Sequence, residues 1–208
     1  MMKRDVPRRR MHLLRLAWVA MLAALSLLGD PRATASIAPL REVSYYPRNY
    51  AWLEFWANWD DARDEMAPDL DLIRGLGANT VRFFVHPDAF SYADPTQIQH
   101  TSFEEALVLI DTHGLRAHVN LFDCWWARDE IEGSRAWMEA FVAPYAGDPR
   151  IALWELQNEV DLADPVARDW VQVLLPELRR ISGSTPCTVS LLDVEQLDDL
   201  EALGPPDL

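Results

Sequence analysis

Cysteine is nearly absent from this sequence, and its histidines are scattered. The 208 residues include only two cysteines, Cys124 and Cys187, which is too few for a fold built on disulfides. We expect two unpaired thiols, with one bridge between them as the alternative. No Cys and His residues share the spacing of metal ligands, and no glycine-rich phosphate loop follows a predicted strand. The sequence therefore indicates neither a metal nor a nucleotide cofactor.

Positive charge is also scarce. Lys3 is the only lysine, and residues 1–35 hold seven of the 19 basic residues but only two of the 33 acidic ones. The remaining 173 residues carry 12 basic and 31 acidic residues, a formal net charge of −19. Such a chain repels nucleic acid and anionic lipid. A neutral partner, such as a polysaccharide or an oligosaccharide, fits this charge better.

The N-terminus has the pattern of an export signal. Basic residues precede an apolar run of 14 residues at positions 16–29, and the small residues Ala33-Thr34-Ala35 follow. The run is shorter than the roughly 20 residues of a membrane span, so an uncleaved anchor is the less favoured alternative. We predict a signal peptide at 1–35 and a secreted or periplasmic protein with no membrane association after cleavage. The pair Arg9-Arg10 leaves open a twin-arginine export route.

Four short apolar or β-branched runs recur at a nearly constant interval. They begin at residues 80, 116, 151 and 187, which are 36, 35 and 36 residues apart. Helices are predicted before the first run at 66–76 and between the runs at 103–110, 134–145 and 165–180, and a fifth follows the last run. Their expected caps are Ser102 with Glu105 in a capping box, then Ser134, Asp164 and Asp193. Repeated βα units of this kind predict a parallel sheet.

The apolar residues 50–56 fit as a first strand, which gives five βα units. A closed eight-stranded barrel takes about 250 residues. We therefore expect residues 36–208 to form an α/β domain, a (β/α)8 TIM barrel truncated to about its first five βα units. An open, doubly wound sheet, which can be complete with five strands, is the alternative.

The fourth strand ends in Trp154-Glu155-Leu156-Gln157-Asn158-Glu159. This segment resembles the Asn-Glu signature of clan A retaining glycoside hydrolases, in the form found in family 5 cellulases and mannanases. The resemblance implies that Glu159 is the general acid/base and that Asn158 binds the sugar 2-hydroxyl. The alternative is a strand that simply runs into a polar loop. Acid/base catalysis needs a carboxyl that can be protonated, which apolar walls favour. Candidates for such walls are Trp154, Leu156, Trp125 and Trp126.

The second strand supports this resemblance. Its sequence, Gly77-Ala78-Asn79-Thr80-Val81-Arg82, is similar to strand two of the same family, where the arginine supports the catalytic carboxylates. An arginine inside an apolar strand needs a carboxylate partner, which is Glu155 or the missing nucleophile. The alternative is an edge strand with Arg82 facing solvent.

Aromatic residues near the predicted strand ends are candidate walls for sugar rings, whose apolar faces stack on aromatics. Binding and packing are equally expected for any one tryptophan. The candidates for substrate binding are Trp52, Trp56, Trp125, Trp126 and His86.

In the family, the nucleophile lies on strand seven, which is absent from the 208 residues. Retaining hydrolysis needs that second carboxylate about 5 to 5.5 Å from the first. We therefore expect a glycoside hydrolase site that is inactive in this chain alone. The alternative is a non-catalytic, sugar-binding remnant of such an enzyme.

Overall fold

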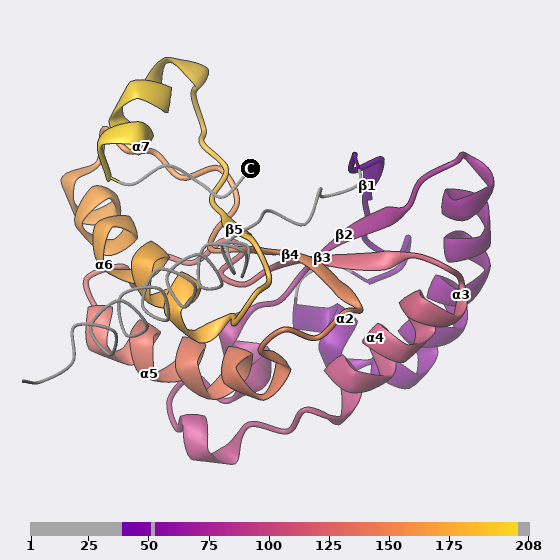
Figure 1. The fold of residues 1–208 in the computed structure, drawn as a ribbon. Coiled ribbons are helices and arrows are strands. Elements are labelled where there is room, and N and C mark those ends of the chain that lie inside the picture. The colour runs from indigo at the N-terminus through magenta and orange to yellow at the C-terminus, as the bar shows by residue number, and fades with distance from the viewer. Residues whose placement is uncertain (1–38, 51–52, 204–208) are drawn as a thin grey trace, which may run out of the picture. The chain divides into compact units, whose positions relative to one another are not determined.

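The computed structural model describes residues 39–50 and 53–203 of the chain (Figure 1). The predicted signal peptide and Trp52 lie outside the described residues. Leu40–Leu208 forms one compact unit, which holds all the strands and helices found among the described residues. No helix among the described residues is long and apolar enough to cross a membrane.

Five parallel strands form a single sheet in the order β1-β2-β3-β4-β5. They are β1 Glu42–Ser44, β2 Thr80–Phe84, β3 Arg116–Asn120, β4 Ile151–Glu155 and β5 Cys187–Thr188. The order never reverses along the chain, whereas a doubly wound sheet needs a reversal at its switch point. The described residues are therefore consecutive βα units of a (β/α) barrel, and the doubly wound alternative is wrong.

Helices connect the strands and lie along one face of the sheet, while the last helix, α7, follows β5 and lies apart at the upper left (Figure 1). The α-helices are α2 Leu53–Ala57, α3 Trp59–Gly75, α4 Thr101–Thr112, α5 Ile131–Val142, α6 Pro165–Ile181 and α7 Leu197–Leu203. Short 3-10 turns are η1 Pro87–Phe90, η2 Pro95–Gln97, η3 Ala143–Tyr145 and η4 Val194–Gln196.

The core lies between the sheet and these helices. Trp154 of β4 is fully buried and stacks near Phe103 of α4, with 6.3 Å between ring centroids. On α6, the buried residues Trp170, Val171, Leu174 and Leu178 recur at helical spacing, so one apolar stripe faces the core. Alternate strand residues point to the other face of the sheet, and these carry the polar side chains of the site.

The first strand does not lie where the apolar residues 50–56 predict it. The chain is helical at Leu53–Ala57, and β1 is the shorter segment Glu42–Ser44. Phe55, Trp56 and Trp59 are all buried. Their spacing suits one face of a helix rather than the alternation of a strand.

Two of the four expected helix caps are wrong. Helix α4 begins at Thr101 without a side-chain cap, and the Glu105 carboxylate is instead bound by Trp59 Nε1 at 2.7 Å and Arg63 Nη1 at 3.1 Å. Helix α5 begins at Ile131, so Ser134 lies inside it and is buried.

The two remaining caps are confirmed. Asp164 accepts a hydrogen bond from the Val166 amide at the start of α6, and Asp193 accepts one from the Glu195 amide at η4, just before α7. Each carboxylate satisfies an amide that has no partner within its helix.

The two cysteines are not joined by a disulfide, as expected. Cys124 follows β3, whereas Cys187 begins β5, is buried and donates to Ser182 Oγ at 3.2 Å.

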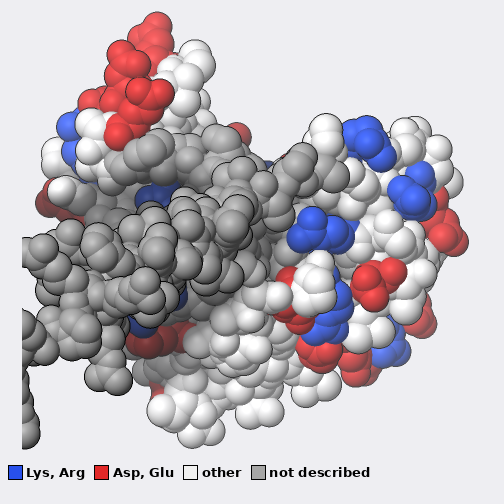
Figure 2. All heavy atoms as spheres, viewed as in Figure 1, with Lys and Arg blue, Asp and Glu red and all other residues white. Residues whose placement is uncertain are grey.

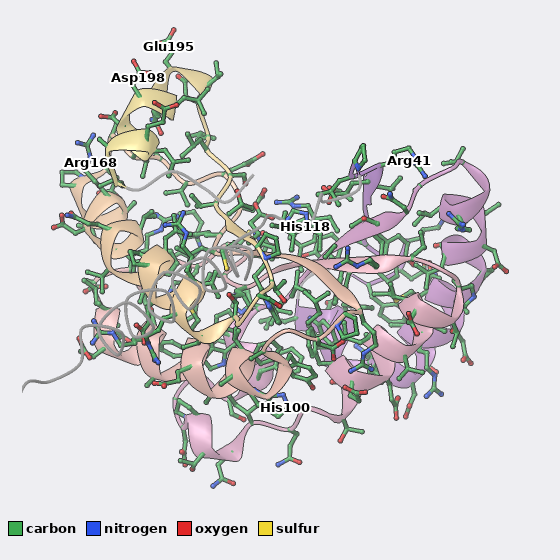
Figure 3. All side chains as sticks on the ribbon, viewed as in Figure 1. Arg41, His100, His118, Arg168, Glu195 and Asp198 are labelled. Atoms are coloured by element: carbon green, nitrogen blue, oxygen red, sulfur yellow. The ribbon has the colours of Figure 1, made fainter. Side chains whose placement is uncertain are left out.

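Charge is unevenly spread over the described surface. Figure 2 shows basic and acidic side chains interspersed over the helices on the right, while acidic side chains gather at the upper left. That region is α7 and the segment before it, where Glu195 and Asp198 lie at the periphery, far from the central His118 (Figure 3).

Candidate active site

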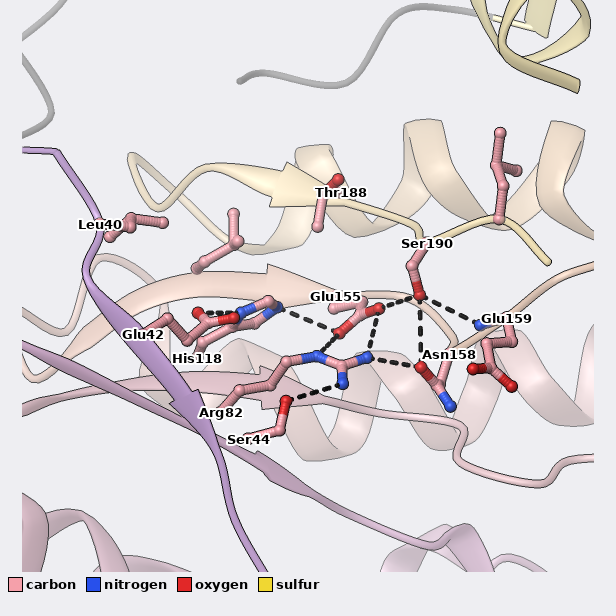
Figure 4. Close-up of a pocket in the computed structure, with 12 residues that line it drawn as sticks. Leu40, Glu42, Ser44, Arg82, His118, Glu155, Asn158, Glu159, Thr188 and Ser190 are labelled. Atoms are coloured by element: carbon pink, nitrogen blue, oxygen red, sulfur yellow. Dashed lines mark hydrogen bonds and ion pairs between the residues drawn. The ribbon is translucent and has the colours of Figure 1, made fainter. Parts of the chain in front are cut away.

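Three neighbouring strands bring charged side chains together on the face of the sheet opposite the helices. Arg82 on β2 is in register with His118 on β3, and Asn120 on β3 is in register with Glu155 on β4. Because alternate residues share a face, Arg82, His118 and Glu155 project into the same space (Figure 4).

Arg82 and Glu155 form a buried, two-pronged ion pair. Arg82 Nε donates to Glu155 Oε2 at 2.6 Å, and Nη2 donates to Oε1 at 2.8 Å. Glu155 is 1% exposed. Burial by itself would raise the pKa of Glu155, but the hydrogen bonds and charges of His118 and Arg82 outweigh it and lower that pKa to about 2. Glu155 is therefore a fixed carboxylate, and of the two predicted partners of Arg82 it is the one that the structure shows.

His118 lies between two carboxylates. Its Nδ1 is 2.6 Å from Glu42 Oε2 on β1, and its Nε2 is 3.1 Å from Glu155 Oε2. The second contact is an ion pair without hydrogen-bond alignment. Burial would lower the pKa of His118, but the two glutamates raise it above its ordinary value. His118 thus links the edge strand β1 to the centre of the sheet.

The turn after β4 presents the next two residues to the same space. Asn158 Oδ1 accepts a hydrogen bond from Arg82 Nη2 at 2.8 Å. This contact fixes which end of the amide faces the arginine, because only the oxygen can accept. Asn158 Nδ2 donates to no described residue, so it remains available to a hydroxyl oxygen of a ligand.

Glu159 is exposed and has the left-handed backbone angle φ of 50°, which is uncommon for a residue with a side chain. Its amide donates to Ser190 Oγ at 3.1 Å. Its carboxylate receives neither a hydrogen bond nor an ion pair from the part of the chain that the structure describes. Unlike that of Glu155, this carboxylate is not held by another side chain among the described residues.

These groups surround a pocket of about 570 Å³, which we call the central pocket. It is lined by Leu40, Glu42, Ser44, Arg82, His118, Leu153, Glu155, Asn158, Glu159, Thr188, Ser190 and Leu191 (Figure 4). Its volume suits a small ligand.

A second, more apolar pocket of about 470 Å³, the aromatic pocket, lies beyond the ends of β2 and β3. It is lined by Leu53, His86, Asp88, Cys124, Trp125, Trp126 and Ala127. Trp126 is 82% exposed, whereas Trp125 is 6% exposed. Burial lowers the pKa of His86 despite the charges of Asp88 and Asp123. Its Nδ1 accepts a hydrogen bond from the Asp88 amide at 3.3 Å, which leaves Nε2 as the donor of the neutral ring.

No protein-family model and no curated protein matches this sequence, but solved structures do. A GH5_18 protein from Streptomyces cattleya, with one glutamate replaced by alanine and in complex with Manβ1-4GlcNAc, matches 74% of this chain with a TM-score of 0.58 and 22% identity. The exo-β-1,4-mannosidase Op5Man5 from Opitutaceae bacterium strain TAV5 matches 72%, with a TM-score of 0.57 and 25% identity. Endoglucanase Cel5A from Thermotoga maritima matches 60%, with a TM-score of 0.51 and 18% identity.

This chain shares their barrel fold. It spans 45%, 31% and 44% of the length of those three structures, so the likeness concerns less than half of each. The neighbours are glycoside hydrolase family 5 enzymes, which is the family that the strand-end motif resembles.

The structure divides the candidate site residues into groups. Glu159, Asn158 and Arg82 all line the central pocket, whereas Trp125, Trp126 and His86 line the aromatic pocket.

Trp56 is instead a core residue. It is 7% exposed and donates its indole N–H to the Phe84 carbonyl oxygen at 3.0 Å. Its ring also lies 4.9 Å from that of Phe90. This position leaves almost no surface for a sugar, so the substrate-binding interpretation of Trp56 is wrong.

The expected apolar walls around Glu159 are also wrong. Trp154 and Leu156 are fully buried, and Trp125 and Trp126 line the other pocket. The neighbours of Glu159 in the central pocket are mainly polar.

Sequence reasoning missed three members of the central pocket: Glu42, His118 as an ion-pair partner, and Ser190. Glu42 had no signal, since β1 was not recognised. For His118 the sequence did hold a signal, because this residue lies on the same face of β3 as Asn120 and the neighbouring strand carries an arginine.

Proposed function

We propose that this chain forms part of the site of a retaining β-glycoside hydrolase, cellulase- or mannanase-like, with Glu159 as the acid/base. The observation that carries this proposal is the placement of Asn158-Glu159 at the C-terminal end of a barrel strand, facing a pocket anchored by the Arg82–Glu155 pair. Reactive groups of such barrels lie at this end of the strands.

The three residues take distinct roles. The Glu159 carboxyl would protonate the leaving glycosidic oxygen and, as carboxylate, take a proton from water in the second step. Asn158, its oxygen held by Arg82, would donate from Nδ2 to a sugar hydroxyl. Support for a β-linked oligosaccharide comes from the Streptomyces cattleya neighbour in complex with Manβ1-4GlcNAc.

The central pocket offers one free carboxylate, and a double displacement needs two. Of the three glutamates that line it, Glu155 is held by Arg82 and Glu42 contacts His118. The attacking carboxylate would have to come from outside the described residues. We therefore expect this chain to bind β-linked sugars without hydrolysing them.

The aromatic pocket would hold a further part of the substrate. Trp126 offers an exposed indole face for a sugar ring, and His86 and Asp88 supply polar groups beside it. The proposed partner is a neutral polysaccharide or oligosaccharide, met outside the cytoplasm if residues 1–35 direct export.

A non-catalytic sugar-binding protein is the second candidate. It is favoured by the exposure of Glu159 and by the exposed tryptophan at the other pocket.

One experiment separates the two candidates. Purified protein is incubated with β-1,4-mannobiose in the presence and absence of sodium azide, a small external nucleophile. If Glu159 is an acid, azide attacks the anomeric carbon, the C–O bond breaks, and Glu159 gives its proton to the leaving oxygen. The expected product is an α-mannosyl azide, detected by mass spectrometry and NMR.

The control variants decide the outcome. Glu159→Gln should abolish azide-dependent cleavage, while Glu132→Gln, which changes an exposed helical glutamate, should leave it unchanged. Mannobiose binding without any azide product would favour the sugar-binding protein. Hydrolysis without azide would refute the assignment of a single free carboxylate, and no binding at all would refute both candidates.

A further inference from the structure

Ser190 lies immediately beyond β5, beside the turn that carries Asn158 and Glu159. Its amide donates to the Gln157 carbonyl at 3.2 Å, and its carbonyl accepts from the Val160 amide at 2.9 Å. A parallel bridge between Val160 and Leu191 continues this pairing. The backbone of Ser190 therefore brackets the turn on both sides of Glu159.

The Ser190 hydroxyl also contacts this turn. It donates to Glu155 Oε1 at 2.6 Å and accepts the Glu159 amide at 3.1 Å. Asn158 Oδ1 is 3.5 Å away. Since a hydroxyl has one proton, the shorter contact takes it, and Asn158 keeps its stronger bond from Arg82.

This arrangement connects a rigid anchor to a strained residue. Glu155 is fixed by Arg82 and is buried, whereas Glu159 holds a left-handed φ of 50°. A non-glycine residue keeps such a conformation only when its surroundings determine it. Among the described residues, the Ser190 hydroxyl is the only acceptor for the Glu159 amide.

We propose that Ser190 is a positioning residue, which acts through Glu159. Its hydroxyl holds the Glu159 backbone in the conformation that presents the carboxylate to the central pocket. This role depends on the proposed function only in that a sugar is the ligand expected to contact Glu159. Alanine would lose both hydroxyl contacts, while threonine would retain the oxygen.

The test uses amide hydrogen exchange and carbon chemical shifts from NMR on the purified protein. In Ser190→Ala, the Glu159 amide should exchange about tenfold faster, the effect of losing one ordinary hydrogen bond, and its shifts should move away from left-handed values. The Val160 amide, bound to the backbone of Ser190, should change little. Ser190→Thr should restore the Glu159 values. Ser184→Ala, at an exposed serine before β5, should change neither the Glu159 nor the Val160 amide.

Binding of Manβ1-4GlcNAc is measured in parallel, and it should weaken in Ser190→Ala and recover in Ser190→Thr. If the unaltered protein binds no sugar, the proposed function fails, while the exchange data still decide the role of Ser190. Unchanged Glu159 exchange and shifts in Ser190→Ala would overturn the inference.

A measurement on the unaltered protein covers the case in which Ser190→Ala does not fold. The Glu159 amide should exchange at least about tenfold more slowly than the Asp161 amide, relative to unstructured rates, since Asp161 donates its amide to no described residue. Equal protection would also overturn the inference.

Discussion

Replacing Glu155 with glutamine should destabilise the protein by about 3 kcal/mol at pH 7. The folded protein holds the pKa of Glu155 at about 2, against an ordinary value of 4.5. At about 1.4 kcal/mol per pKa unit, this difference corresponds to roughly 3 kcal/mol of stability. Breaking a buried ion pair by removing one partner costs a similar amount, about 3–5 kcal/mol. Glu155 is 1% exposed, so solvent screens this interaction little.

The effect should depend on pH with a definite sign. A carboxylate with a lowered folded pKa contributes its stability above its unfolded pKa and loses it as the pH falls through the folded value. The stability difference between the unaltered protein and Glu155→Gln should therefore be constant from pH 7 to about 5 and shrink between about 4.5 and 2. Urea unfolding followed by tryptophan fluorescence at several pH values measures it.

The matched control is Glu132→Gln. Glu132 is paired with Arg135 one helical turn away, but its side chain is 80% exposed, so we expect a loss below about 0.5 kcal/mol. A loss for Glu155→Gln as small as that of the control, or one that does not change at acid pH, would refute the view that Glu155 is the fixed anchor of the central pocket.

Three further predictions concern other residues. Because the pKa of His118 is raised, its contribution to the free energy of unfolding should be full below about pH 6.5 and fall as the pH rises through the folded pKa. In urea unfolding, His118→Gln should therefore lose less stability than the unaltered protein as the pH rises. Trp126→Ala should change the unfolding free energy by less than about 0.5 kcal/mol, since the ring is 82% exposed. It should nevertheless weaken mannobiose binding measured by calorimetry, and unaltered binding would show that Trp126 does not contact the sugar. Asn120 is fully buried, and neither polar atom of its amide has a partner among the described residues, so Asn120→Leu should raise the thermal midpoint, and a lower one would indicate a partner outside them.

The central strands could be predicted from the sequence by their short apolar or β-branched runs and by the nearly constant interval between them. β4 is buried at all five positions, and the interval between strands reflects the crossover helices. β1 could not be found in this way. The three residues of β1 include one apolar side chain, Val43. The strand is held in the sheet by its pairing with β2 and by the contact of Glu42 with His118, and both exist only after folding.

The site, too, could be predicted only in part. That Arg82 has a carboxylate partner could be predicted, since an arginine on an apolar strand needs one. The sequence left two candidates, Glu155 and the missing nucleophile, and only the structure shows that Glu155 is a partner. The role of Ser190 could not, because it depends on how the chain after β5 lies beside the turn at Glu159. The helix at Leu53–Ala57 could have been predicted, since the buried residues Phe55, Trp56 and, at the start of α3, Trp59 recur at helical spacing.

The two border strands of the sheet are short. In the described part of the chain, β1 has three residues and β5 has two. A foreign strand that docked alongside either one would meet only a few open backbone amides and carbonyls. Lateral growth into a fibre needs long, flat margins, so the borders of this sheet are poor templates for it.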